Sequence, residues 1–301
     1  MRKKTKRNAL VAVIVIIVLI CGLFIANYYK SYKRIVYSKD ALILKSYNGT
    51  STSKNFIHNN ESIPVLMYHS IPDASSGNIM EVSKGQFEEE MKYLKDNGYH
   101  TLSADEFYDF IVKDKPVLKK SVLITFDDGY ENQYKNAYPV LKKYKFNAVM
   151  FIITDYLDKG TLYLKSNELK TMSDNGISIE SHTTNHAKLD KLSYKDQFKT
   201  LRDSQNKLEG ICNKAVRFIA YPYGYFNKDT VEASQKSGYI MAFTTSGKWA
   251  NINKGVYAVN RIYIFPQFNL GDFKSRITNP NYPQLVHPID MLKGAYKTFI
   301  K

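Results

Sequence analysis

Short apolar runs alternate with helical segments from Pro64 onward, and this alternation is what most limits the folds open to the chain. Each run is short and rich in β-forming residues, as expected for strands that a parallel sheet buries on both faces. Because strands and helices alternate along the chain, we predict a mainly parallel α/β sheet, most simply a distorted βα-barrel. The runs lie at 65–68, 99–102, 122–126, 148–153, 177–179, 216–221, 239–243 and 261–264.

Capping signals indicate where several of the intervening helices begin and end. Ser83 and Ser103 are followed three residues later by Gln86 and Glu106, the pattern of a capping box. Gly98 and Gly238 are typical of helix C-termini. Further helices are expected over 134–145, 193–212 and 227–237.

The N-terminal segment has the pattern of a membrane anchor. Five basic residues lie among the first seven, and a run of low polarity follows over residues 9–26. As a helix this run would reach about 27 Å, close to the thickness of a bilayer core, with the basic flank in the cytoplasm. The alternative is a cleaved signal peptide, for which the run offers Ala26 but no small-x-small site.

We therefore predict three parts and a single-pass protein of the cell membrane. Residues 1–29 form the cytoplasmic basic flank and a transmembrane signal anchor, and 30–62 form an extracellular tether. Residues 63–301 form the main domain, outside the cell. The net charge of +15 is too scattered for a nucleic-acid interface, so no nucleic-acid partner is expected.

Two adjacent aspartates, Asp127 and Asp128, follow the run at 122–126, and Gly129 then lets the backbone turn. Two carboxylates at the end of a buried strand repel each other and lose hydration. Such a pair is costly unless a cation, a hydrogen-bond donor or a proton offsets it. Taken alone, the Asp-Gly pair also fits a simple turn or a helix N-cap.

Two histidines at ligand spacing follow the run at 177–179. His182 and His186 are four residues apart, and on a helical turn both imidazoles would face one ion. With Asp128 they would form a two-histidine, one-carboxylate site, and three ligands with an open position are typical of catalytic zinc. Iron, cobalt and nickel suit the same ligands, so the residues leave the metal open.

A third segment, Pro222-Tyr223-Gly224, ends the run at 216–221. It fits a rigid β-turn, and beside the other two segments it also fits a wall of the same pocket. All three segments come just after expected strands. In βα-barrels the chemistry collects at the C-terminal rim, so we expect them to meet there.

Together, the three segments resemble the polysaccharide deacetylases of carbohydrate esterase family 4. TFDDG, HTTNH and PYG occur in that family's order, and the similarity extends from Pro64 to about Ile277. The resemblance implies that Asp127 is the general base and that Asp128, His182 and His186 bind a divalent metal. It further implies that Pro222 and Tyr223 line the substrate groove, and that the Tyr223 amide donates to the oxyanion.

The chain departs from the commoner family pattern in two places. Ala220 stands where an arginine usually orients the base, and Arg261 is a candidate to replace it. The general acid is also open. His69 ends the strand-like run PVLMYHS, whereas His287 lies in a proline-rich tail. The PVLMYHS opening and the AYPYG variant resemble the branch that deacetylates poly-N-acetylglucosamine.

The resemblance implies metal-dependent N-deacetylation of a cell-surface polysaccharide that contains N-acetylglucosamine, either peptidoglycan or poly-N-acetylglucosamine. Trp249, the single tryptophan, is a candidate to line the substrate groove or to pack locally. Two alternatives stay open: a non-catalytic wall-binding protein on the same fold, and an O-acetyl esterase. The sequence gives no indication of oligomeric state.

Overall fold

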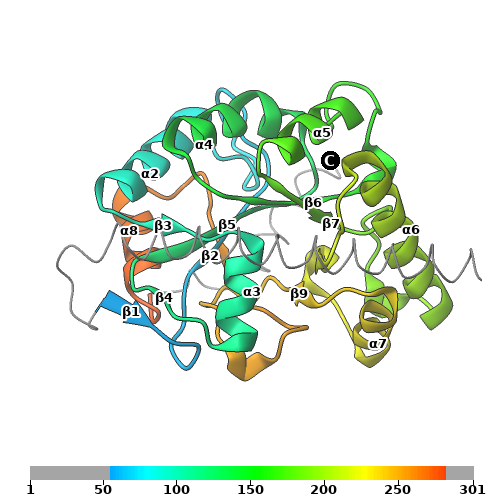
Figure 1. The fold of residues 1–301 in the computed structure, drawn as a ribbon. Helices are drawn as coiled ribbons and strands as arrows, with labels where there is room; N and C mark the ends of the chain where they lie inside the picture. The colour runs from blue at the N-terminus through cyan, green and yellow to red at the C-terminus, as the bar shows by residue number, and fades with distance from the viewer. Residues whose placement is uncertain (1–54, 283–301) are drawn as a thin grey trace, which may run out of the picture. The chain divides into compact units, whose positions relative to one another are not determined.

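The computed structural model of the protein describes residues 55–282, and its centre is a parallel sheet that curls into a distorted barrel (Figure 1). The strand order is β10-β2-β5-β6-β7-β8-β9, and β3 pairs with the start of β5. The strands are β2 (Val65–Tyr68), β3 (His100–Thr101), β5 (Ser121–Phe126), β6 (Val149–Ile152), β7 (Ser178–Ser181), β8 (Phe218–Ala220), β9 (Met241–Phe243) and β10 (Ile262–Tyr263). Each contains or overlaps an apolar run in the sequence, so the predicted βα-barrel is confirmed.

The two outer strands, β9 and β10, meet without forming a continuous ladder. One parallel bridge joins Phe243 to Val259, and the Thr244 amide donates to the Val259 carbonyl at 2.8 Å. The distortion of the barrel is located at this seam. Arg261, whose side chain also crosses the seam, lies directly before β10.

Apart from α3, the helices follow one another around the outside of the sheet, in the same order as the strands that they connect (Figure 1). Helix α2 contacts α4 and α8, α5 contacts α6, and α6 contacts α7. Their bounds are α2 (Lys84–Asp96), α3 (Ala104–Lys113), α4 (Tyr138–Tyr144), α5 (Ser166–Asp174), α6 (Tyr194–Cys212), α7 (Lys228–Ser237) and α8 (Leu270–Thr278). A π-helical segment, Gln133–Ala137, precedes α4.

Alternate residues of the strands contribute to two separate hydrophobic clusters. In β6, Met150 and Ile152 belong to the cluster that the outer helices cover, whereas Val149 and Phe151 belong to a second cluster. Helix α3 adds Phe107 and other apolar side chains to this second cluster. Burial on both faces explains why the strands read as continuous apolar runs.

Of the two expected capping boxes, only one is complete. The Ser103 hydroxyl accepts from the Glu106 amide, and the Glu106 carboxylate accepts from the Ser103 amide at 2.7 Å. Ser83 caps α2, but the Gln86 side chain donates to the carbonyls of Phe265 and Phe268 instead of returning to the cap. Tertiary partners therefore outcompete the local box at Ser83.

The folded unit begins earlier than the sequence predicts. Strand β1 (Phe56–Ile57) pairs antiparallel with β4 (Val117–Leu118), so residues 56–62, which we expected in the tether, belong to the folded unit. Helices α5 and α8 were also not expected, because each is short and largely polar in sequence. No helix within residues 55–282 is both long and apolar enough to cross a bilayer. The expected anchor at 9–26 and His287 fall outside the described residues.

Replacing Ser103 with Ala is expected to lower the free energy of unfolding by about 1 kcal/mol, because the first turn of α3 loses its cap. Urea denaturation followed by circular dichroism measures the change. Ser103→Asp, which restores a capping acceptor, is the matched control and should recover most of the loss. An equal loss in both variants would contradict the capping role.

Candidate active site

The side chains singled out in the sequence meet at the C-terminal ends of the strands. Asp127 and Asp128 follow β5, His182 follows β7, and His69 follows β2. The backbone of Asp128 is left-handed, with a φ of 72°. The parallel register aligns these ends, since Tyr68 pairs with Phe126 and Ile152 pairs with Ser181.

Asp128, His182 and His186 converge on one point. Asp128 Oδ1 lies 3.5 Å from Nε2 of each histidine, and the two Nε2 atoms are 3.1 Å apart. Tetrahedral zinc with bonds of about 2.0–2.1 Å would separate its ligands by about 3.3 Å, so the three atoms fit such an ion. Asp128 Oδ1 is also buried and accepts no hydrogen bond from a described residue, which leaves it suited to a cation.

The two histidines reach this geometry on an irregular turn and not on the helical turn that we expected. Thr183 and His186 both have positive φ, 69° and 58°, and residues 182–186 form no helix. The Nδ1 atom of His182 donates to the Ala220 carbonyl at 2.8 Å, which leaves Nε2 available as a ligand. Burial is the main factor that lowers the pKa of His182, and burial lowers the pKa of His186 to about 3. Both imidazoles are therefore neutral.

Asp127 is paired with Arg261 in a fully buried, two-pronged ion pair. Nη1 donates to Asp127 Oδ1 at 2.6 Å and Nη2 donates to Oδ2 at 2.7 Å. The same guanidinium donates through Nε to the Thr244 carbonyl and through Nη1 to the Thr125 hydroxyl. Arg261 therefore contacts the residue that the sequence suggested and fixes the orientation of its carboxylate.

The two neighbouring aspartates have opposite electrostatic environments. Burial opposes ionisation of Asp127, but the charge of Arg261 outweighs it and holds the pKa well below its usual range. In Asp128, burial first and the charge of Asp127 second raise the pKa to about 7. The pair thus consists of one compensated carboxylate and one that still needs a positive partner.

His69 and a buried glutamine complete the region around Asp127. His69 Nε2 lies 4.0 Å from Asp127 Oδ2, and burial lowers the pKa of this histidine to about 4. Gln133 Nε2 donates to the carbonyls of both Asp127 and His69, at 2.6 and 2.8 Å. Gln133 therefore ties the ends of β5 and β2 together. No pattern in the sequence pointed to it, although it lies in the π-helical segment, a feature common near functional sites.

The Pro222–Gly224 turn places an exposed aromatic side chain beside the histidines. The ring centroids of Tyr223 and His186 are 4.4 Å apart, and Tyr223 is 52% exposed. Gly224 is required there, because its φ is 72° and a Cβ would lie 2.9 Å from the Thr245 backbone nitrogen. The Lys188 ammonium lies 5.5 and 5.3 Å from the ring centroids of Tyr223 and Tyr225.

Trp249 lies in a different environment from the one we considered for substrate binding. Its indole N–H donates to the Arg276 carbonyl at 2.7 Å, and its ring packs against the outer hydrophobic cluster. These contacts match the alternative of local packing, and we leave Trp249 out of the groove.

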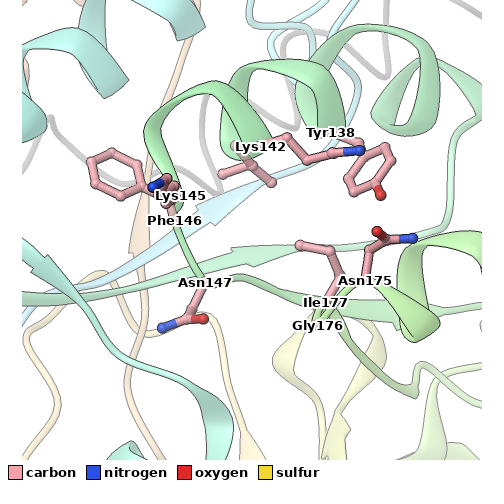
Figure 2. Close-up of a pocket in the computed structure, with 9 residues that line it drawn as sticks. Tyr138, Lys142, Lys145, Phe146, Asn147, Asn175, Gly176 and Ile177 are labelled. Carbon is pink, nitrogen blue, oxygen red and sulfur yellow. The ribbon is translucent and has the colours of Figure 1, made fainter. Parts of the chain in front are cut away.

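A cavity of about 290 Å³ lies away from these residues (Figure 2). Asn147 and Ile177 line it just before β6 and β7, whereas the aspartates and histidines follow the opposite ends of the strands. Residues along α4 and the two residues that follow α5 also line it, and Tyr138 faces Asn175 across it (Figure 2). The cavity shares no residue with the candidate active site.

Purified protein is expected to bind one divalent ion per chain, and His182→Ala or Asp128→Asn should abolish this binding, because each removes one of three ligand atoms. Metal content after dialysis, measured by inductively coupled plasma mass spectrometry, tests this. Glu131→Gln, which changes an acidic residue paired with Lys135 on the same loop, is the control and should retain the ion. Full metal content in His182→Ala would rule out the site.

Arg261→Met is expected to reduce the free energy of unfolding by about 3–5 kcal/mol, because Asp127 stays buried without its partner. The double variant Asp127→Asn/Arg261→Met should lose less, since no charge is left uncompensated. Urea denaturation of the metal-free proteins gives both values. Equal losses in the single and double variants would show that the pair does not interact as described.

Comparison with known proteins identifies the family. The family model described as polysaccharide deacetylase matches residues 114–242. YxkH of Bacillus subtilis, classed by name as a polysaccharide deacetylase, is 42% identical over 204 residues, which cover 68% of this chain and 72% of YxkH. A poly-beta-1,6-N-acetyl-D-glucosamine N-deacetylase of Staphylococcus aureus is 32% identical over 245 residues, 77% of this chain and 81% of that protein.

The structure of Streptococcus pyogenes deacetylase PplD in complex with acetate superposes with a TM-score of 0.68 and 32% identity, covering 72% of this chain and 98% of that one. The chain therefore belongs to the polysaccharide deacetylase family of hydrolases.

Proposed function

We propose that the protein is a metal-dependent hydrolase that removes N-acetyl groups from a cell-surface polysaccharide containing N-acetylglucosamine. The observation that supports the proposal is that the two adjacent aspartates have different partners. Asp127 is ionised and oriented by Arg261, whereas Asp128 lies with two neutral imidazoles in a geometry suited to a cation. Zinc is the proposed ion; cobalt, nickel and iron suit the same ligands.

A divalent metal bound by Asp128, His182 and His186 would polarise the acetamide carbonyl and lower the pKa of a bound water toward about 7. Asp127 is the proposed general base for that water. Its Oδ2 lies 3.9 Å from His182 Nε2, so this oxygen faces the ligand cluster. Arg261 holds the carboxylate in this orientation throughout, and the Tyr223 amide is the proposed donor to the tetrahedral oxyanion.

The leaving amine must gain a proton when the carbon–nitrogen bond breaks. His69 is the proposed general acid, because its Nε2 lies 4.0 Å from Asp127 Oδ2 on the side of the cluster where β2 ends. In this scheme the water proton goes to Asp127, which passes it to the neutral His69, and His69 then gives it to the amine. Both side chains thereby return to their starting states. His287, outside the described residues, is the alternative acid.

We propose two classes of substrate. The Staphylococcus aureus relative is named for poly-beta-1,6-N-acetyl-D-glucosamine, which supports that polymer as the substrate. Peptidoglycan is the second candidate, since it carries the same N-acetyl group. We place the activity outside the cell, on a protein held in the membrane by residues 9–26.

Replacing Asp127 with Asn is expected to lower kcat for acetate release at least a hundredfold, because the base is lost. The side chain keeps its shape and is not a proposed ligand, so the bound metal should remain. Acetate release is measured on poly-N-acetylglucosamine and on purified peptidoglycan, side by side, with and without chelator. His69→Gln should also lower kcat, and should leave the metal content unchanged.

The same assay distinguishes the alternatives. Acetate release from O-acetylated sugars alone would indicate an esterase, and binding without any acetate release would indicate a non-catalytic wall protein. Wild-type activity in Asp127→Asn would remove the base assignment. Lys236→Ala is a surface change in α7 that removes an ion pair with Glu232. It is the control for activity lost during purification.

A further inference from the structure

Exposed apolar side chains gather beside the metal-ligand cluster. Within residues 55–282, five large apolar residues are strongly exposed, and four of them lie on the loops that follow β6 and β8. On the β8 side these are Tyr223, Tyr225 and Phe226, and on the β6 side Leu162 is the most exposed of all at 58%. Such a concentration around a polar centre is typical of a binding groove.

The β6–α5 loop, residues 154–164, is attached to both parts of the ligand cluster. At its start, the amides of Thr154 and Asp155 donate to the carbonyls of the histidine turn at 183–184. At its end, backbone hydrogen bonds at 2.9 Å join Leu162 and Leu164 to the segment 129–131, directly after Asp128. A loop bonded at both ends to the elements that carry the ligands is a fixed wall and not a free flap.

Aromatic rings continue from this loop to the ligand Asp128. Tyr130 and Tyr163 stack with centroids 5.4 Å apart, and Tyr156 lies 4.6 Å from Tyr163. Tyr130 is two residues from Asp128, and burial first and the charge of Asp128 second raise the pKa of its hydroxyl. Tyr130, Tyr156 and Tyr163 thus line one side of the ligand cluster. We call these three tyrosines and Leu162 the β6–α5 wall.

A second aromatic wall lies against another ligand of the cluster, His186. Tyr223 lies against His186, and the Tyr223 and Tyr225 rings are 6.2 Å apart. Aromatic rings that carry hydroxyl groups suit the faces and edges of sugar rings, which are apolar on one surface and polar at the rim. Two such walls, one next to Asp128 and one against His186, are suited to an extended chain and not to a single sugar.

We infer that the β6–α5 wall is a substrate-binding surface, which makes the site a groove for an N-acetylated glycan with sugar units on both sides of the reacting acetamide. Leu162 and Tyr163 are the specificity-determining residues of this surface. The inference takes its substrate class from the proposed function. It adds that the enzyme prefers long glycan chains to short ones.

The test compares substrates of two lengths, a pentasaccharide and a disaccharide of N-acetylglucosamine. For Leu162→Ser and Tyr163→Ala, we expect KM for an N-acetylglucosamine pentasaccharide to rise about tenfold, the effect of exposing one large apolar contact. KM for the disaccharide should change less, so that the ratio of kcat/KM between pentasaccharide and disaccharide falls. Val112→Ser is the matched control, because Val112 is the fifth exposed apolar residue and lies on α3.

Two results would overturn the inference. One is an unchanged pentasaccharide KM in both wall variants, and the other is an equal loss on both substrates. An equal loss would mean that the changes disturb Asp128 through Tyr130 and do not remove a sugar contact. Metal content and thermal unfolding of each variant exclude loss of the ion or of the fold as the cause.

A binding measurement separates failure of this inference from failure of the proposed function. Calorimetric titration of the pentasaccharide into Asp127→Asn, alone or with Tyr163→Ala, needs no turnover. We expect the second change to weaken binding about tenfold, even if the wild-type protein releases no acetate. Equal affinity of the two proteins would exclude the β6–α5 wall.

Discussion

The ion pair between Arg261 and Asp127 is the interaction on which the rest of the site depends. It is fully buried, it joins both carboxylate oxygens, and its guanidinium also bonds Thr244 at the end of β9 and Thr125 within β5. A buried carboxylate without such a partner would take up a proton. The same side chain crosses the seam where β9 and β10 lack a continuous ladder, so one residue supports both the closure of the barrel and the ionisation of Asp127.

Once Asp127 is compensated, its neighbour is the residue that requires a cation. The Oδ1 atom of Asp128 is buried beside a fixed negative charge, and it faces two imidazoles that burial keeps neutral. An ion at that point satisfies all three groups together. The two aspartates have the same side chain but different roles, because Arg261 pairs with Asp127 whereas the two histidines lie beside Asp128.

Much of this arrangement could be predicted from the sequence, and the exceptions have physical causes. The apolar runs predicted the strands because parallel strands are buried on both faces, and the ends of those strands predicted where Asp128, His182 and His186 would meet. The histidine turn was assigned to the wrong local structure, because spacing does not distinguish a helical turn from a loop with positive φ. Gln133 and the β6–α5 wall were missed, since single polar and aromatic residues have no pattern until the fold brings them together. The early start of the domain was missed because two-residue strands carry no periodicity.

The most direct test of this account is the anomalous difference map of a crystal grown with zinc. We expect one peak at about 2.0–2.2 Å from Asp128 Oδ1, His182 Nε2 and His186 Nε2, with Asp127 bound to Arg261 and absent from the coordination shell. A zinc ion coordinated by Asp127, or one found away from His182 and His186, would contradict it.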